Sequence, residues 1–119
     1  MRYLFLAYAD AKRLDALSTS EREAFEHACL ANDKALRESG HLLTGETLQR
    51  NNTTTVQVHS GDLSVTDCPL TAANEQLVGL FFIDARDLNE AIQVAAQMPQ
   101  VRGGPIEVRT LMETDKFGE

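Results

Sequence analysis

"VTDCPLTAANEQLVGLFFIDARDL", residues 65–88, decides the fold, because it places an apolar strand between a polar loop and the start of a helix. Residues 77–83 are apolar at both odd and even positions, which is typical of a strand covered on both faces. Asp87 ends the turn that follows at 84–87, and it can cap a helix that begins at Leu88. This stretch therefore predicts a central strand that leads directly into a helix.

The N-terminal stretch "RYLFLAY", residues 2–8, has the same two-faced apolar pattern and predicts a second central strand. The other elements are expected as a helix at 18–40, a strand at 41–48, a hairpin at 53–67, a helix at 88–98 and a last strand at 105–111. Helical spacing predicts two inward stripes, which are Phe25, Cys29, Asn32 and Leu36 on the first helix, and Leu88, Ile92 and Ala95 on the second.

This order of elements is β-α-β, a hairpin insertion, and β-α-β again. It predicts an α+β fold of the ferredoxin-like type, an antiparallel sheet with both helices on one face. The other face then needs its own cover, because large exposed apolar patches are rare on monomers. We expect a homodimer in which two sheets meet face to face as an α+β barrel. One domain is expected at residues 1–112, followed by a flexible tail at 113–119.

Composition excludes several classes of protein. The net charge is −7 and the eleven basic residues are scattered, so nucleic acid is not an expected partner. No apolar stretch is long enough for a membrane span, and the apolar start is too short for a signal peptide. Two cysteines in 119 residues do not form a disulfide framework, which favours a cytoplasmic location.

Several segments together resemble the YCII-related proteins, and specifically their DGPF-domain branch. They are "GHLLTGETL" at 40–48, "TTTVQV" at 53–58, "EQLVGLFFIDARDLNEAI" at 75–92 and "EVR" at 107–109. The resemblance runs over residues 2–112. It implies a dimeric α+β barrel and a small bacterial cytoplasmic protein, often encoded near extracytoplasmic-function sigma factors. It also implies kinship with small-molecule lyases, dehydrochlorinases and oxygenases of the wider superfamily.

The chain departs from the family pattern at three places. The usual Asp-Gly-Pro-Phe is Asp67-Cys68-Pro69-Leu70, the next four residues are Thr71-Ala72-Ala73-Asn74, and Val78 replaces the first glycine of the usual pair. Some relatives carry a His–Asp pair at the positions of Cys29 and Met98. That pair is absent here and is not carried over.

Three polar residues flank the central strand and are candidates for a site. Asp67, Glu75 and Gln76 are expected to converge at the barrel mouth, where a poorly solvated carboxylate can act as a general base. The alternative is local: Asp67 would accept backbone N–H bonds in its own turn, and Glu75 would cap a short helical segment. For Asp67 the local alternative is favoured.

Three further residues lie on expected strands. Glu46 and Arg109 either face a ligand in the barrel or form an ion pair with each other, and a salt bridge, across strands or across the dimer, is favoured. Tyr8 supplies a phenol donor or simply packs. The catalytic candidates are therefore Asp67, Glu75 and Glu46, and the ligand-binding candidates are Tyr8, Glu46, Asp67, Gln76 and Arg109.

No metal or cofactor is expected, because the three histidines lack ligand spacing and no glycine-rich phosphate loop is present. Cys68 has no basic neighbour to activate it as a nucleophile. Three functions remain open. The first is a small-molecule binding protein or vestigial enzyme, and the second is a lyase or isomerase acting on a small enolisable or aromatic substrate. The third is an interaction module linked to a sigma factor. The first is preferred.

Overall fold

The structure is a computed structural model that describes residues 1–49, 52–69 and 75–112. In chain order the elements are β1 (Arg2–Asp10), α1 (Ala11–Asp15), α2 (Thr19–Glu38), β2 (Leu42–Thr47), β3 (Thr55–His59), β4 (Asp62–Thr66), β5 (Glu75–Asp84), α3 (Leu88–Gln97), the 3-10 helix η1 (Pro99–Arg102) and β6 (Ile106–Thr110). The predicted tail at 113–119 and the segment 70–74 lie outside the described residues.

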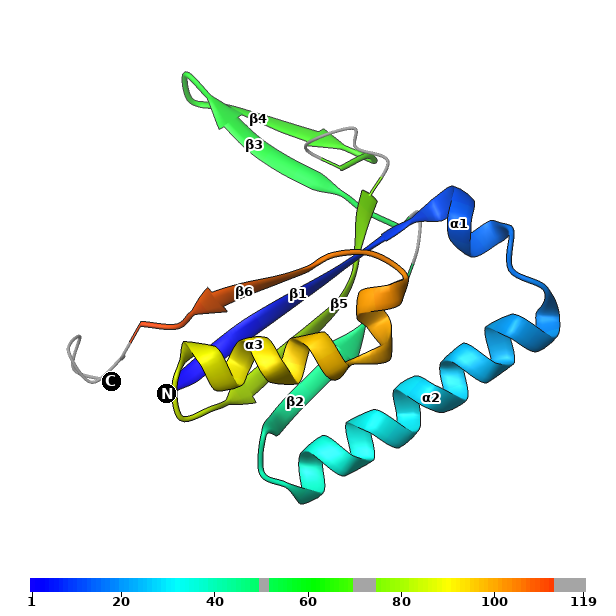
Figure 1. The fold of residues 1–119 in the computed structure, drawn as a ribbon. Coiled ribbons are helices and arrows are strands. Elements are labelled where there is room, and N and C mark those ends of the chain that lie inside the picture. Colours follow the sequence, from blue (N-terminus) through cyan, green and yellow to red (C-terminus); the bar gives the residue numbers. More distant parts are fainter. Residues whose placement is uncertain (50–51, 70–74, 113–119) are drawn as a thin grey trace.

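The main sheet has the strand order β2-β5-β1-β6, with every neighbouring pair antiparallel. The two strands with apolar residues on both faces, β1 and β5, occupy its centre, as their sequence pattern predicts. Helices α2 and α3 lie on the same face of this sheet (Figure 1). The ferredoxin-like α+β fold is thereby confirmed. Strands β3 and β4 form a separate hairpin, at the predicted position.

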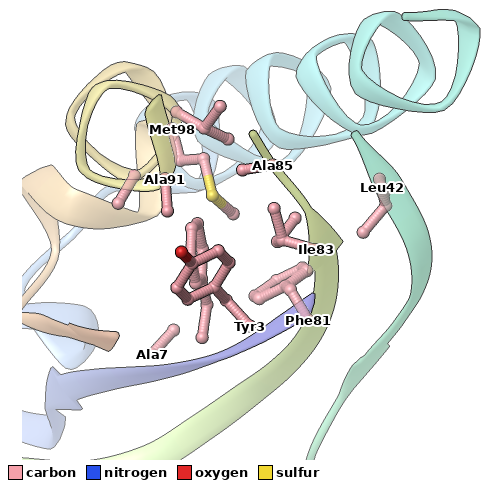
Figure 2. Close-up of a cluster of buried hydrophobic side chains, with 11 residues drawn as sticks. Tyr3, Ala7, Leu42, Phe81, Ile83, Ala85, Ala91 and Met98 are labelled. Carbon is pink, nitrogen blue, oxygen red and sulfur yellow. The ribbon is translucent and has the colours of Figure 1, made fainter. Parts of the chain in front are cut away.

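The hydrophobic core lies between the main sheet and the helices. Tyr3, Phe5, Ile83 and Met98 are its largest fully buried side chains. Figure 2 shows the side chains of β1 and β5 pointing toward α3 and the residues that follow it. This packing buries one face of the sheet only, and no helix of the described residues lies on the opposite face (Figure 1).

Phe81 occupies a space that two glycines leave for it. A Cβ atom at Gly45 would lie 2.8 Å from the Phe81 ring, and one at Gly79 would lie 3.1 Å from it. Both contacts are closer than real Cβ atoms comfortably make. The two glycines therefore allow the aromatic ring to lie directly over the backbones of β2 and β5.

Helix α2 begins and ends where its sequence predicts. The Ser18 hydroxyl accepts a hydrogen bond from the backbone N–H of Glu21, and the Glu21 carboxylate accepts one from the N–H of Ser18, which is a capping box. Gly40, with φ of +82°, follows the helix in the left-handed conformation that favours glycine. The predicted stripe Phe25, Cys29, Asn32 and Leu36 is half-buried, so it does face inward, but no residue of α2 is fully buried.

The predicted inward face of α3 is wrong at two of its three positions. Leu88 and Ile92 are half exposed, whereas Ala91, Val94 and Ala95 are buried. Small alanine side chains let the helix backbone lie close to the large side chains of the sheet, where Leu88 or Ile92 would be too bulky. Two short elements, α1 and η1, follow β1 and α3 at places where the sequence pattern predicts no helix. No helix among the described residues is long and apolar enough to cross a membrane.

Candidate functional site

The uncovered face of the main sheet, here called the open face, gathers apolar and charged side chains. Paired residues of antiparallel strands point to the same side of a sheet, so the register defines this face. One row across the sheet is Glu46, Leu80, Leu6 and Glu107, and the next row is Thr44, Phe82, Leu4 and Arg109. The four apolar side chains form the floor of the open face, and polar side chains stand at both edges.

At the β6 edge, three side chains form a hydrogen-bonded group. Arg109 Nε donates to Glu107 Oε1 at 2.6 Å, and the Tyr8 hydroxyl donates to Glu107 Oε2 at 3.3 Å. Residues 107 and 109 point to the same side because side chains alternate along a strand. The chain thus presents a phenol, a carboxylate and a guanidinium together beside the apolar floor.

The two titratable groups of this cluster are shifted in opposite directions. The hydrogen bond from Arg109, with its positive charge, lowers the pKa of Glu107 below its ordinary value, and the Tyr8 hydroxyl adds to the effect. Partial burial raises the pKa of Tyr8, and the negative charge of Glu107 raises it further, while Arg109 opposes the rise. Near neutral pH, Glu107 is therefore ionised and Tyr8 keeps its proton as a donor.

Glu46 and Arg109 do not form the predicted ion pair within one chain. Glu46 lies on edge strand β2 and Arg109 on the opposite edge strand β6, with β5 and β1 between them. Three strand spacings amount to about 14 Å, which is too far for direct contact. Arg109 pairs with Glu107 instead. Glu46 makes no hydrogen bond or ion pair with any residue that the structure describes, and its side chain is exposed.

The three residues expected at the barrel mouth are placed differently from one another. Asp67 is exposed at the base of the hairpin, where the Thr55 hydroxyl donates to the Cys68 carbonyl at 2.6 Å. Glu75 is the first residue of β5 and pairs with Asp10, while the segment 70–74 before it lies outside the described residues. Gln76 pairs with the buried Ala9 and therefore points away from the open face.

Sequence reasoning missed Glu107 as a site residue, although it named Arg109 two positions further on. Alternation along a strand places both on one face, and that signal was present in "IEVRT". Glu107 matters because it holds Arg109 and Tyr8 together.

The cysteines and histidines do not form a centre of their own. Cys29 and Cys68 are both free thiols, and burial raises the pKa of Cys29 to about 11, which disfavours a reactive thiolate. His27 and His59 are exposed. Within residues 1–49, 52–69 and 75–112 no group of three or more His, Cys, Asp or Glu side chains is arranged to hold a metal ion.

A second, open cleft of about 310 Å³ lies where α2 ends and α3 begins, and its lining includes Ser39, His41, Arg86 and Glu90. His41 Nδ1 lies 2.7 Å from Ser39 Oγ, and His41 Nε2 lies 3.3 Å from Glu90 Oε1. This sequence of contacts resembles a Ser-His-Glu triad, but the Ser39 hydroxyl donates to the Leu36 carbonyl at 3.0 Å and so has no proton to give the imidazole. Glu90 also accepts from the backbone N–H of Arg86 and pairs with its guanidinium, and these contacts lower the Glu90 pKa. The group joins the two helices.

Replacing Arg109 with glutamine is expected to raise the pKa of Glu107 toward its ordinary value of 4.5, because it removes the contact that lowers that pKa most. Titration of the Glu107 carboxyl carbon by NMR measures the change. Lys34→Gln removes the same charge from an exposed position on α2 and should leave the pKa unchanged. An unchanged Glu107 pKa in the Arg109→Gln variant would contradict the hydrogen bond between Arg109 and Glu107.

The same pair has a consequence for stability with a defined sign. The folded-state pKa of Glu107 lies below its value in the unfolded chain, so the ionised carboxylate stabilises the fold above pH 4.5. This stabilisation is lost as the pH falls through the lowered pKa. The Arg109→Gln variant should show a smaller loss of stability over that acidic range than the wild type does.

The fold and the open face define a class of protein, a ferredoxin-like α+β unit with one face of its sheet uncovered by the described residues. Within that class, the model of the YCII-related domain matches residues 1–115, so the chain belongs to the YCII-related family. This confirms the family resemblance of the sequence, while the DGPF branch stays a prediction from residues 67–78. A comparison with curated proteins gave no match.

Among solved structures, the chain is similar to 5-chloro-2-hydroxyhydroquinone dehydrochlorinase (TftG) from Burkholderia phenoliruptrix AC1100, in its complex with 2,5-dihydroxybenzoquinone. The TM-score is 0.57 and the sequence identity is 13%, over 98% of each chain. At this identity the likeness shows a shared fold.

Proposed function

We propose that this protein binds a small, largely apolar molecule with polar substituents on the open face, inside a chamber completed by a second copy of the chain. The observation that carries the proposal is the floor of leucine and phenylalanine side chains with polar groups at both edges. Small-molecule sites combine such apolar walls with a few placed polar groups. Arg109 supplies donors and Tyr8 a phenol oxygen at one edge, and Glu46 supplies an acceptor at the other.

The homodimer is part of this proposal. Leu4, Leu6 and Leu80 are only half-buried in the single chain, and Phe82 is more exposed than they are. An isologous contact between two such faces would remove them from water and enclose the ligand.

A thermal-shift screen tests the proposal. The first compounds are hydroxylated benzenes and quinones, because the solved structure that shares this fold binds 2,5-dihydroxybenzoquinone; keto acids and hydroxy acids follow. A ligand at one hundred times its Kd should stabilise the fold by about 2.7 kcal/mol, which is several degrees in Tm. Tyr8→Phe and Arg109→Gln should reduce the shift, and Lys34→Gln should preserve it. If every compound leaves the Tm unchanged, or if the variants bind as the wild type does, the open face is not the site.

Glu46 favours one alternative, a lyase or isomerase that acts on a small enolisable or aromatic substrate. The Glu46 carboxylate has no side-chain partner among the described residues, and a covering copy would place it in the poorly solvated surroundings in which a carboxylate can act as a general base. Glu46→Gln would then abolish turnover of a bound compound while preserving its affinity. A sigma-factor partner is supported by the family resemblance alone. A cytoplasmic location is supported by the family resemblance and by the low number of cysteines.

A further inference from the structure

The hairpin β3–β4 carries an apolar face that nothing in the described chain covers. Its register pairs Val56 with Val65 and Val58 with Leu63, so these four side chains point to the same side. They are 61%, 58%, 65% and 67% exposed, respectively. Figure 1 shows the hairpin standing away from the sheet and helices, beyond the end of the sheet where β5 begins. The strands of the hairpin pack chiefly on each other.

An exposed apolar face on an isolated hairpin is unusual for a surface in water. A two-stranded hairpin is marginally stable on its own. Aliphatic cross-strand pairs stabilise a hairpin most when another layer covers them. The four exposed side chains amount to an apolar patch on the order of 400 Å², the size at which such patches mark interaction surfaces. No charged side chain belongs to this face.

We propose that the hairpin is a dimerisation arm that seats Val56, Val58, Leu63 and Val65 on a second copy of this chain. The area argues for that partner. A stable interface buries about 800 Å² on each partner, and the hairpin alone offers about half of this. The same chain also carries the uncovered apolar open face, for which a second copy is already the proposed cover, and in an isologous dimer each hairpin contact occurs twice, which doubles the area that the arm buries.

Charge points the same way. The chain carries a net charge of −7, so two copies repel each other overall, and surfaces that carry no charge add nothing to this repulsion when they meet. The hairpin face and the floor of the open face are such surfaces. This proposal rests on the dimer of the proposed function. It goes further in that the hairpin insertion, and not only the open face, determines the affinity between two copies.

Two adjacent residues of β4 provide a matched test. Val65 lies on the apolar face and Thr66 on the opposite face, and both side chains are exposed in the single chain. Val65→Glu and Thr66→Glu therefore add the same charge at neighbouring positions. Sedimentation equilibrium over a range of concentrations measures the dimer Kd of each variant. We expect Val65→Glu to raise the Kd at least about 100-fold, and Thr66→Glu to change it less than about threefold.

Leu6→Glu tests the open-face contact independently of the hairpin, because Leu6 lies on the floor of the open face. If the wild type is dimeric, Leu6→Glu dissociates it and Val65→Glu leaves its Kd unchanged, then the arm is wrong and the open-face dimer stands. A wild type that is monomeric at every concentration overturns both. Amide hydrogen exchange gives a second readout, since residues 55–66 should be protected in the dimer and lose protection on dilution. Equal exchange in both states also overturns the arm.

Discussion

Gly104→Ala is expected to be the most damaging single substitution in this protein, with a loss of more than about 4 kcal/mol in the free energy of unfolding. A Cβ atom at residue 104 would collide with the carbonyl oxygen of Tyr8, and it would lie 2.8 Å from the Tyr8 carbonyl carbon and 3.0 Å from the Cα of Ala9. All three are backbone atoms of the central strand β1, which cannot move aside as a flexible side chain can. The expected result is an unfolded or aggregated protein, or a much lower midpoint in urea.

The position also explains why the clash cannot be relieved locally. The backbone N–H of Tyr8 donates to the Pro105 carbonyl at 3.0 Å, so the chain that follows Gly104 is bonded to the same point of β1. Moving residue 104 away from Tyr8 would break this hydrogen bond and the entry into β6. It would also displace Tyr8, whose hydroxyl reaches Glu107 on the open face.

Gly103→Ala is the matched control, since it adds the same methyl group one residue earlier. A Cβ atom there would meet the Gln100 carbonyl oxygen at 3.6 Å and the Phe25 ring at 3.8 Å, which are ordinary contacts. Its φ of −89° suits any residue, so the change in stability should stay within about 1 kcal/mol. Equal stability of the two variants in urea would contradict the close approach of residue 104 to β1.

The elements that the sequence predicts correctly are those with a local signal. Caps at Ser18 and Asp87 define the starts of α2 and α3, and two-faced apolar runs identify the central strands β1 and β5. The face of α3 is different, because helical spacing alone cannot tell whether Leu88 and Ile92 or the alanines approach the sheet. That choice depends on how closely the helix packs, which is set by residues far away in the sequence.

The candidate site shows the same division. Tyr8 and Arg109 were predicted from strand positions, and the structure places them on one face with Glu107 between them. Gln76 was predicted with them, and strict alternation back from Phe82 would indeed place it on the open face. The register instead shifts between Ala7 and Tyr8, opposite Val78, and this bulge turns Gln76 to the other side. A bulge depends on the pairing of two strands, so neither strand's sequence reveals it.

Phe81→Ala is expected to cost about 3–5 kcal/mol, because it opens a cavity in the core that the fold has little means to close. Phe81 is 4% exposed and belongs to the buried cluster of Figure 2. Its ring also covers the backbones of Gly45 and Gly79, which have no side chains to replace it. Thermal unfolding should show a lowered Tm at every protein concentration, since the lost contacts lie within one chain.

Phe82→Ala changes the neighbouring residue, whose side chain lies on the opposite face of the sheet. It separates the contribution of the core of one chain from that of a contact between two copies. Phe82 is 36% exposed in the single chain, so its removal should cost an isolated copy much less than the removal of Phe81 does. If a second copy covers the open face, the loss of stability grows with protein concentration above the dimer Kd of the wild type, because binding stabilises the wild type by mass action. A loss that is the same at all concentrations would place Phe82 outside any interface and leave the open face without its proposed cover.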